Sequence, residues 1–187
     1  MKETQETQET NPIVNYYNPN IICRPAVYAD IDIIIARSAE QGDNKPREVL
    51  DTYLREQENG ERIVIVAEIN REIAGYVTLF PKAKDAVPYL ESGIPEIKDF
   101  NVFEKYRRRG VGTVLMNKIE SIAAGIADTV CLGVGLHSGY GAAQRMYIKR
   151  GYVFDGSGVW DGFVPAKPYG MVENGDDLVL YMSKKLR

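Results

Sequence analysis

The stretch YRRRGVGTVL, Tyr106 to Leu115, joins three consecutive arginines to two glycines and then continues into aliphatic residues. It lies between an apolar run that ends near Val102 and a long segment with the apolar spacing of a helix. The first turn of a helix has unpaired N–H groups and a positive partial charge, so it attracts anions. Glycines let a phosphate approach the backbone closely because no Cβ intervenes. We therefore expect a phosphate-binding loop in which Arg107, Gly110 and Gly112 act together.

The glycine spacing excludes two common nucleotide-binding motifs. The P-loop pattern GxxxxGK[ST] is absent, and the Rossmann pattern GxGxxG fails because its third glycine position holds Leu115. The pattern that remains is RxxGxG. A site with several histidines is excluded because His137 is the only histidine, so no metal is expected. The GxSxG motif of serine hydrolases is also missing.

The composition is ordinary for a soluble globular protein, with 44% apolar and 26% charged residues. The formal net charge of −3 gives no global field that would recruit nucleic acid or anionic lipid. The N-terminal segment lacks the apolar region of a signal peptide, and no apolar run approaches the roughly 18 residues of a membrane span. We expect a cytoplasmic protein that binds neither nucleic acid nor membranes. Cys23 and Cys131 are far apart and are expected to be buried free thiols.

The chain divides into a short leader and one domain. Residues 1–19 are polar and contain an ETQ repeat, which predicts a disordered or loosely docked leader. Residues 20–187 are long enough to bury one substantial core and are predicted to form a single domain. Asn70 and Arg71 predict a hairpin turn, and residues 155–177, rich in glycine and proline, predict a connection without regular structure. Helices are expected over 28–41, 45–57, 110–127 (with Ile126 on its apolar face) and 141–150; strands are expected over 21–27, 62–69, 72–80, 95–102, 128–134, 152–156 and 177–186.

Two blocks of sequence resemble one family. The segment DFNVFEKYRRRGVGTVLMNKIE contains RxxGxG between a strand and a helix, and AQRMYIKRGY, Ala143 to Tyr152, is similar to A-x-x-[LF]-Y-x-x-x-G-[FY]. Together they resemble the GNAT superfamily of N-acetyltransferases over roughly Ile21 to Lys184. The resemblance implies a mixed α/β fold, with a central mixed sheet of about seven strands flanked by about four helices. It also implies that acetyl-CoA is the co-substrate and that its pyrophosphate is bound by the loop Arg107, Arg108, Arg109, Gly110, Val111, Gly112 and Thr113.

Acetyl transfer needs an uncharged amine, stabilisation of the oxyanion and a proton for the departing thiolate. In the resemblance, a carboxylate near the fourth strand removes the amine proton in some members of the family, often through water. Glu96 stands at the matching place, and Asp99 is a second candidate. Strict strand alternation would put these two on opposite faces, although a bulge common in the family could change the phase. The oxyanion would be met by the main-chain N–H of Asn101 or Val102.

Tyr147 matches the tyrosine that donates a proton to the thiolate in the family. The alternative reading is an aromatic side chain that packs with Ala143 and Met146, at helical spacing i, i+3 and i+4. Many relatives have an asparagine three residues before the matched alanine, and here that position holds Tyr140. His137 is the only histidine in the sequence, and a lone histidine is more often a loop residue than a base or a ligand, so we read it as a loop residue.

The acceptor is expected to be a primary amine on a small molecule or a peptide. Its pocket would be built by the first helices, by the loop around Pro88 and Tyr89, and by residues 155–177, which could be a substrate lid or a homodimer contact. Within that segment, Trp160 and Phe163 could form an aromatic wall for a ligand or could cover a core edge. The alternative function is a CoA-binding regulatory or interaction module that has lost turnover, which the missing asparagine favours.

Overall fold

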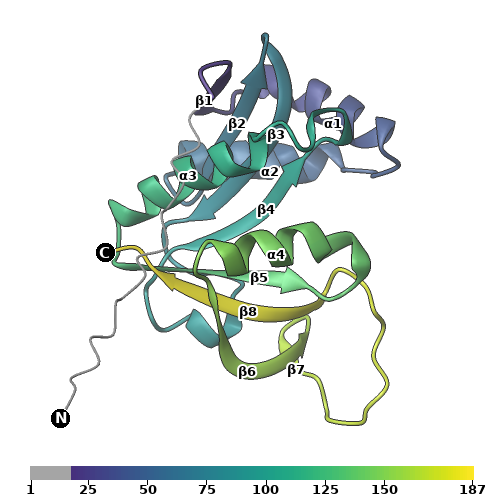
Figure 1. The fold of residues 1–187 in the computed structure, drawn as a ribbon, viewed down its shortest axis with the longest axis vertical. Coiled ribbons are helices and arrows are strands. Elements are labelled where there is room, and N and C mark those ends of the chain that lie inside the picture. Colours follow the sequence, from purple (N-terminus) through teal and green to yellow (C-terminus); the bar gives the residue numbers. More distant parts are fainter. Residues whose placement is uncertain (1–17) are drawn as a thin grey trace, which may run out of the picture.

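The computed structural model describes residues 18–187, which form one eight-stranded mixed sheet with four α-helices (Figure 1). The expected mixed α/β class is confirmed. The strand order is β1-β2-β3-β4-β5-β8-β6-β7. No helix among these residues has the length and hydropathy of a membrane span. The strands are β1 (Ile21–Pro25), β2 (Ile63–Ile69), β3 (Glu72–Phe80), β4 (Glu96–Val102), β5 (Thr129–Gly135), β6 (Val153–Asp161), β7 (Val164–Pro165) and β8 (Leu178–Lys185), and the helices are α1 (Ile31–Glu40), α2 (Arg47–Glu58), α3 (Val111–Ala124) and α4 (Gly141–Lys149).

The sheet is antiparallel except between its two central strands. β4 and β5 are parallel, and they pair only at Glu96 with Cys131 and at Ile97 with Leu132. Figure 1 shows the two strands separating beyond this point, with α4 lying beside β5. Because the backbone groups of the separated parts have no ladder partner, this opening is where a ligand can meet both main chain and side chains.

α3 follows the apolar pattern of its sequence. Its buried residues are Val111, Leu115, Met116, Ile119, Glu120 and Ala123. The prediction for Ile126 is wrong, because α3 ends at Ala124 and Ile126 lies past the helix with 44% of its surface exposed. Gly125 terminates the helix, so Ile126 keeps the apolar helical spacing in the sequence but lies outside the helix.

The hairpin between β2 and β3 is confirmed. Ile69 pairs with Glu72, and the two residues between them, Asn70 and Arg71, have φ angles of 52° and 67°. Two consecutive positive φ angles are the geometry of the tight turn that matches strand twist. Asn adopts this conformation readily, and Arg71 adopts it at a steric cost.

The prediction of an irregular connection over residues 155–177 is wrong for its first half. β6 continues to Asp161, a turn at residues 162–163 leads into β7, and residues 166–177 form the remaining stretch without regular structure. β6 pairs with β8 on both sides of a register shift between Phe154 and Val159. Gly156 and Gly158 sit in this bulge with φ angles of 81° and 86°. The glycines therefore make an irregularity inside a strand rather than a loop.

Candidate functional site

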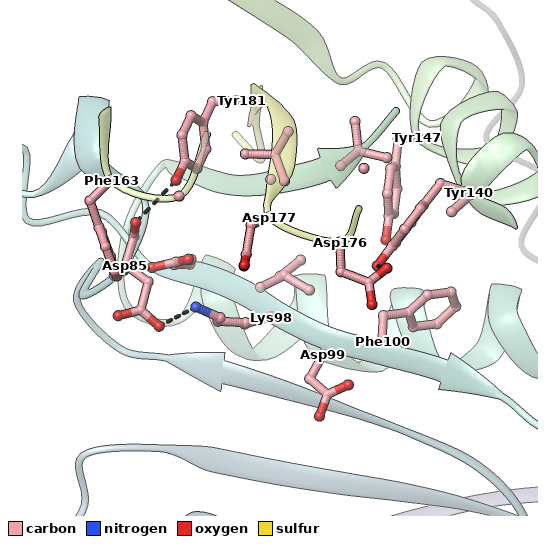
Figure 2. A pocket seen from close by; sticks show the side chains of 18 of the residues that line it. Asp85, Lys98, Asp99, Phe100, Tyr140, Tyr147, Phe163, Asp176, Asp177 and Tyr181 are labelled. Carbon is pink, nitrogen blue, oxygen red and sulfur yellow. Dashed lines mark hydrogen bonds and ion pairs between the residues drawn. The ribbon is translucent and has the colours of Figure 1, made fainter. Parts of the chain in front are cut away.

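A cavity of about 350 Å³ lies where β4 and β5 separate. Its walls come from those two strands, from α4, from the turn after β6 and from the residues just before β8. Figure 2 shows side chains from all these elements turned toward one space, among them Tyr140 and Tyr147 on one side and Phe163 and Tyr181 on the other. Residues from distant parts of the chain therefore share this cavity.

The predicted phosphate loop lies at the start of α3. Gly110 is the N-cap residue with a left-handed φ of 88°, and Arg108 also has a positive φ of 61°. No side chain caps the helix, and no described residue accepts a hydrogen bond from the amides of Val111, Gly112 or Thr113. Three free amides at the positive end of a fourteen-residue helix can bind an anion.

The three arginines of the loop differ in their surroundings. The Arg107 side chain folds back, donating to the Val102 carbonyl at 3.1 Å and pairing with Glu104 at 3.0 Å. The Arg109 guanidinium lies 5.9 Å from the centre of the Tyr106 ring. The Arg108 side chain has no hydrogen bond or ion pair with the rest of residues 18–187. The arrangement gives the motif arginine, Arg107, a role in holding the turn, and leaves Arg108 with a guanidinium free to add charge at the rim.

Gly112 links the phosphate loop to the cavity. A Cβ at this position would lie 3.2 Å from the ring of Phe100 and 3.8 Å from the sulfur of Met146. Phe100 lines the cavity, and its ring lies 6.4 Å from that of Tyr147. A large side chain at position 112 would therefore disturb both the helix start and the cavity wall.

Tyr147 is buried in the protein with its hydroxyl turned into the cavity. The residue is 5% exposed, and Figure 2 shows its hydroxyl pointing down between β5 and β4. Burial raises the pKa of its phenol, so the hydroxyl keeps its proton at neutral pH. Its hydroxyl makes no hydrogen bond with any described residue, although its ring packs against Phe100 and Tyr152. The ring therefore packs as the alternative reading predicts, and the role of the hydroxyl as a proton donor stays a prediction.

Glu96 is almost wholly buried, with 3% of its surface exposed. Its Oε2 atom accepts backbone hydrogen bonds from Lys84, Asp85 and Ala86 at 3.1, 2.9 and 3.0 Å. One carboxylate oxygen thus holds the loop after β3, a role that no sequence pattern indicated. Glu96 also lines the cavity, and its Oε1 atom has no partner among residues 18–187.

Asp99 sits in the bulge that was anticipated for this strand. Tyr76 pairs with Asn101 and Thr78 with Lys98, so two residues of β4 oppose one residue of β3, and Asp99 has a φ of 47°. The bulge changes the phase of alternation, and both Glu96 and Asp99 border the cavity.

Both carboxylate oxygens of Asp99 are already engaged. Oδ2 accepts from the Lys45 ammonium and from the Tyr53 hydroxyl at 2.9 Å, and Oδ1 accepts from the Tyr76 hydroxyl at 3.2 Å. Burial and this carboxylate raise the pKa of Tyr53 and of Tyr76. Asp99 is thus better explained as a partner of α2 and β3 than as a proton acceptor.

The backbone N–H groups of β4 point alternately toward β3 and away from it. The Phe103 amide donates to the Ala74 carbonyl, and Val102 is opposite Gly75 in the next pair. Because antiparallel pairs alternate between bonded and non-bonded types, the Val102 amide points away from β3 and the Asn101 amide points toward it. The predicted oxyanion role therefore fits Val102 better than Asn101.

A polar cluster that the sequence did not predict borders the cavity. The Asp176 carboxylate accepts from the Tyr140 hydroxyl at 2.9 Å and lies 3.0 Å from His137 Nε2. His137 Nδ1 accepts from the Gly139 amide, so Nε2 of the neutral ring carries the proton and donates to Asp176. Hydrogen bonds from His137 and Tyr140 lower the pKa of Asp176. No grouping of His, Cys, Asp and Glu suited to a metal ion occurs within the described range.

The two aromatic residues of the predicted wall have different roles. Phe163 lines the cavity, as one of the two readings expected. Trp160 lies on β6 with its ring 5.9 Å from that of Tyr181, and its indole N–H donates to Ser157. Trp160 therefore covers part of the core, while Phe163 borders the cavity.

The comparisons with known proteins agree on one family. The model of the acetyltransferase (GNAT) family matches residues 31–152. A putative acetyltransferase from Salmonella typhimurium, solved with its cofactor acetyl-CoA, is similar with a TM-score of 0.63 and 19% identity over 90% of this chain and 95% of its own. The spermidine N-acetyltransferase of Vibrio cholerae, in complex with CoA and spermine, is similar with a TM-score of 0.64 and 14% identity over 90% of this chain and 97% of its own. The ribosomal-protein-S18-alanine N-acetyltransferase of Escherichia coli is similar with a TM-score of 0.64 and 13% identity over 89% of this chain and 94% of its own. No curated protein sequence matches the chain.

Proposed function

Because the chain belongs to the GNAT family of acetyltransferases, we propose that it transfers the acetyl group of acetyl-CoA to a primary amine by direct attack while both substrates are bound. The observation that carries the proposal is the position of the Tyr147 hydroxyl, unpartnered within residues 18–187, in a cavity beside the free amides of α3. The Salmonella typhimurium and Vibrio cholerae structures, which contain acetyl-CoA and CoA, support the choice of co-substrate. A primary amine agrees with the spermidine and ribosomal-protein acetyltransferases among the similar structures.

Binding of the co-substrate would use the main chain. We assign the pyrophosphate to the amides of Val111, Gly112 and Thr113 and to the turn at Arg108 to Gly110, with the Arg108 side chain adding charge. Arg107 would act by fixing the turn through Val102 and Glu104.

The reaction would need two protons to leave the acceptor nitrogen and one proton to reach the departing thiolate. One ammonium proton of the acceptor leaves before attack, through water, to Glu96 Oε1, the oxygen that has no partner among the described residues. The nitrogen then bonds to the carbonyl carbon, and the Val102 amide donates to the resulting oxyanion. When the carbon–sulfur bond breaks, the thiolate takes the proton of Tyr147. In the same step the nitrogen loses its second proton, which returns to the Tyr147 oxygen and restores the neutral phenol.

Three measurements test this function. Acetyl-CoA should raise the melting temperature, because a ligand that binds only the folded state stabilises it, and Gly112→Trp should abolish that rise. Thiol release from acetyl-CoA should depend on an added primary amine. Binding without release across an amine panel would instead support the CoA-binding module.

Variants of the catalytic residues separate their roles. Tyr147→Phe should lower kcat by about 100-fold or more and leave the acetyl-CoA shift intact, because a general acid contributes about that much. Glu96→Gln keeps an oxygen that can accept the three loop amides, so its melting temperature should change little while kcat falls. Unchanged kcat in Glu96→Gln would limit Glu96 to positioning the loop. The cytoplasmic location, the homodimer and a single domain with a leader remain predictions, and residues 1–17 of that leader lie outside the described part of the chain.

A further inference from the structure

The second half of β4, which carries the proposed oxyanion donor, has a strand neighbour on one side only. β4 pairs with β5 at Glu96 and Ile97 and no further, whereas its pairing with β3 continues to Val102. A stretch of strand with one ladder partner is held by fewer backbone hydrogen bonds than a central strand. The side chains that anchor this stretch therefore decide where its groups point.

The bulge in this half of β4 contains Asp99, whose φ of 47° lies in the left-handed region. Few residues other than glycine adopt this conformation, and Asp and Asn are the most frequent among them. Such a conformation persists only where the surrounding structure holds it. The contacts that hold Asp99 therefore also hold the bulge.

Three side chains from different parts of the chain hold the Asp99 carboxylate. The ammonium of Lys45, in the connection between α1 and α2, lies 2.5 Å from Oδ2. Tyr53 of α2 donates to the same oxygen at 2.9 Å, and Tyr76 of β3 donates to Oδ1 at 3.2 Å. Lys45 is the one cation of the three. Its side chain is 17% exposed and that of Asp99 is 19% exposed, so little water screens the attraction between them.

The residues that follow Asp99 lie at the proposed reaction site. Phe100 comes next, lines the cavity, and has its ring 6.4 Å from that of Tyr147. Figure 2 shows the side chains of Asp99 and Phe100 leaving β4 on opposite sides. Val102, two residues further on, supplies the amide that we assign to the oxyanion. A rotation of the backbone at Asp99 would therefore displace both the ring that packs on Tyr147 and the oxyanion donor.

We propose that Lys45 is a positioning residue for acetyl transfer, because by holding Asp99 it fixes the bulge that orients Phe100 and the Val102 amide. Lys45 is not one of the residues that line the cavity, so it acts through Asp99. The amides assigned to the pyrophosphate belong to the start of α3 and make no contact with Lys45. Loss of Lys45 should therefore slow the chemical step and leave acetyl-CoA binding unchanged. This inference rests on the proposed acetyl transfer.

The test measures thiol release from acetyl-CoA with butylamine, 1,4-diaminobutane and trialanine, and takes kcat for the amine that reacts fastest. Lys45→Met keeps an unbranched side chain and removes the charge. It should lower kcat about tenfold or more, because a small misplacement of reacting groups slows the chemical step strongly. The acetyl-CoA thermal shift and KM for acetyl-CoA should stay at the wild-type values. Lys45→Arg keeps a cation that can pair with the carboxylate and should restore most of kcat.

A double substitution shows whether Lys45 acts through Asp99. Asp99→Asn removes the charge with which Lys45 pairs, while Asn adopts the left-handed conformation readily, so the backbone preference of the bulge is kept. Substitutions of two residues that act through one contact are not additive. In the Asp99→Asn background, Lys45→Met should therefore change kcat by less than about twofold.

Lys184→Met is the matched control for the loss of a half-buried ion pair. The Lys184 ammonium lies 2.8 Å from Glu120, its side chain is also 17% exposed, and it does not line the cavity. This variant should lower the melting temperature and leave kcat unchanged at a temperature where every variant is folded. Tyr53→Phe removes the second donor to the same Asp99 oxygen and should lower kcat as well, so the test does not depend on the folding of Lys45→Met.

Three results would overturn the inference while leaving acetyl transfer in place. The first is a wild-type kcat in folded Lys45→Met or Tyr53→Phe, and the second is an equal fall of kcat in Lys184→Met. The third is a full tenfold effect of Lys45→Met in the Asp99→Asn background. Failure of the wild type to release thiol with any of the amines would overturn the proposed function as well, so the two failures are distinguishable.

Discussion

Replacing Glu120 with alanine is expected to lower the free energy of unfolding by about 3–5 kcal/mol, the cost of breaking a buried ion pair by removing one partner. Glu120 lies on the buried face of α3 and is 8% exposed. It accepts hydrogen bonds from Arg150 Nε and Nη2 at 2.9 and 2.8 Å, and from Lys184 Nζ at 2.8 Å. One carboxylate thus joins α3 to the end of α4 and to β8.

The magnitude follows from what the substitution leaves behind. The side chains of Arg150 and Lys184 are 14% and 17% exposed, so neither can turn fully into water when the carboxylate is lost. A further hydrogen bond from Arg150 to Asn117 at 2.8 Å holds the guanidinium in place. For a domain of this size, the loss corresponds to a fall of roughly 6–20 °C in melting temperature.

Thermal unfolding of Glu120→Ala and of a matched exposed variant measures the effect. Asp32 pairs with Arg47, but its side chain is 78% exposed, so Asp32→Ala should leave the melting temperature nearly unchanged. If the two variants melt at the same temperature, the buried pair contributes no more than a surface pair and the reasoning fails.

Three further predictions concern stability and reactivity. Burial alone would raise the pKa of Glu120, but its hydrogen-bonded cations lower the pKa below the ordinary 4.5; the stability that this carboxylate contributes is therefore present above pH 4.5 and lost as the pH falls through the folded value, so the gap between wild type and Glu120→Ala should shrink in urea titrations below pH 4.5. Gly75→Ala should destabilise the fold by about 1–3 kcal/mol in the same assay, because the new Cβ would lie 2.5 Å from the backbone oxygen of Asn101, and an unaltered unfolding midpoint would show that β3 and β4 separate freely. Cys131 is fully buried with its pKa raised by burial, so it should react with a thiol reagent only after unfolding; rapid labelling of the native protein would contradict this.

Sequence patterns were most informative where the structure depends on neighbours along the chain. The apolar spacing of α3 and the glycines before it predict a helix with an open N-terminus, because helix geometry and backbone freedom are set within a few residues. The hairpin at Asn70 and Arg71 follows from the same short range. The irregularity of residues 155–161 was misread, since glycine marks a bulge within a strand as readily as a loop.

Tertiary structure alone decided which candidate groups are free to act. Glu96 and Asp99 look alike in the sequence, yet Glu96 keeps one oxygen without a partner among residues 18–187, while Asp99 is engaged at both. Asp176 meets Tyr140 across 36 residues of sequence. These relations depend on how distant segments pack around the opening between β4 and β5, and no local pattern records them, because a side chain's hydrogen bonds are set by its neighbours in space rather than by its neighbours in the chain.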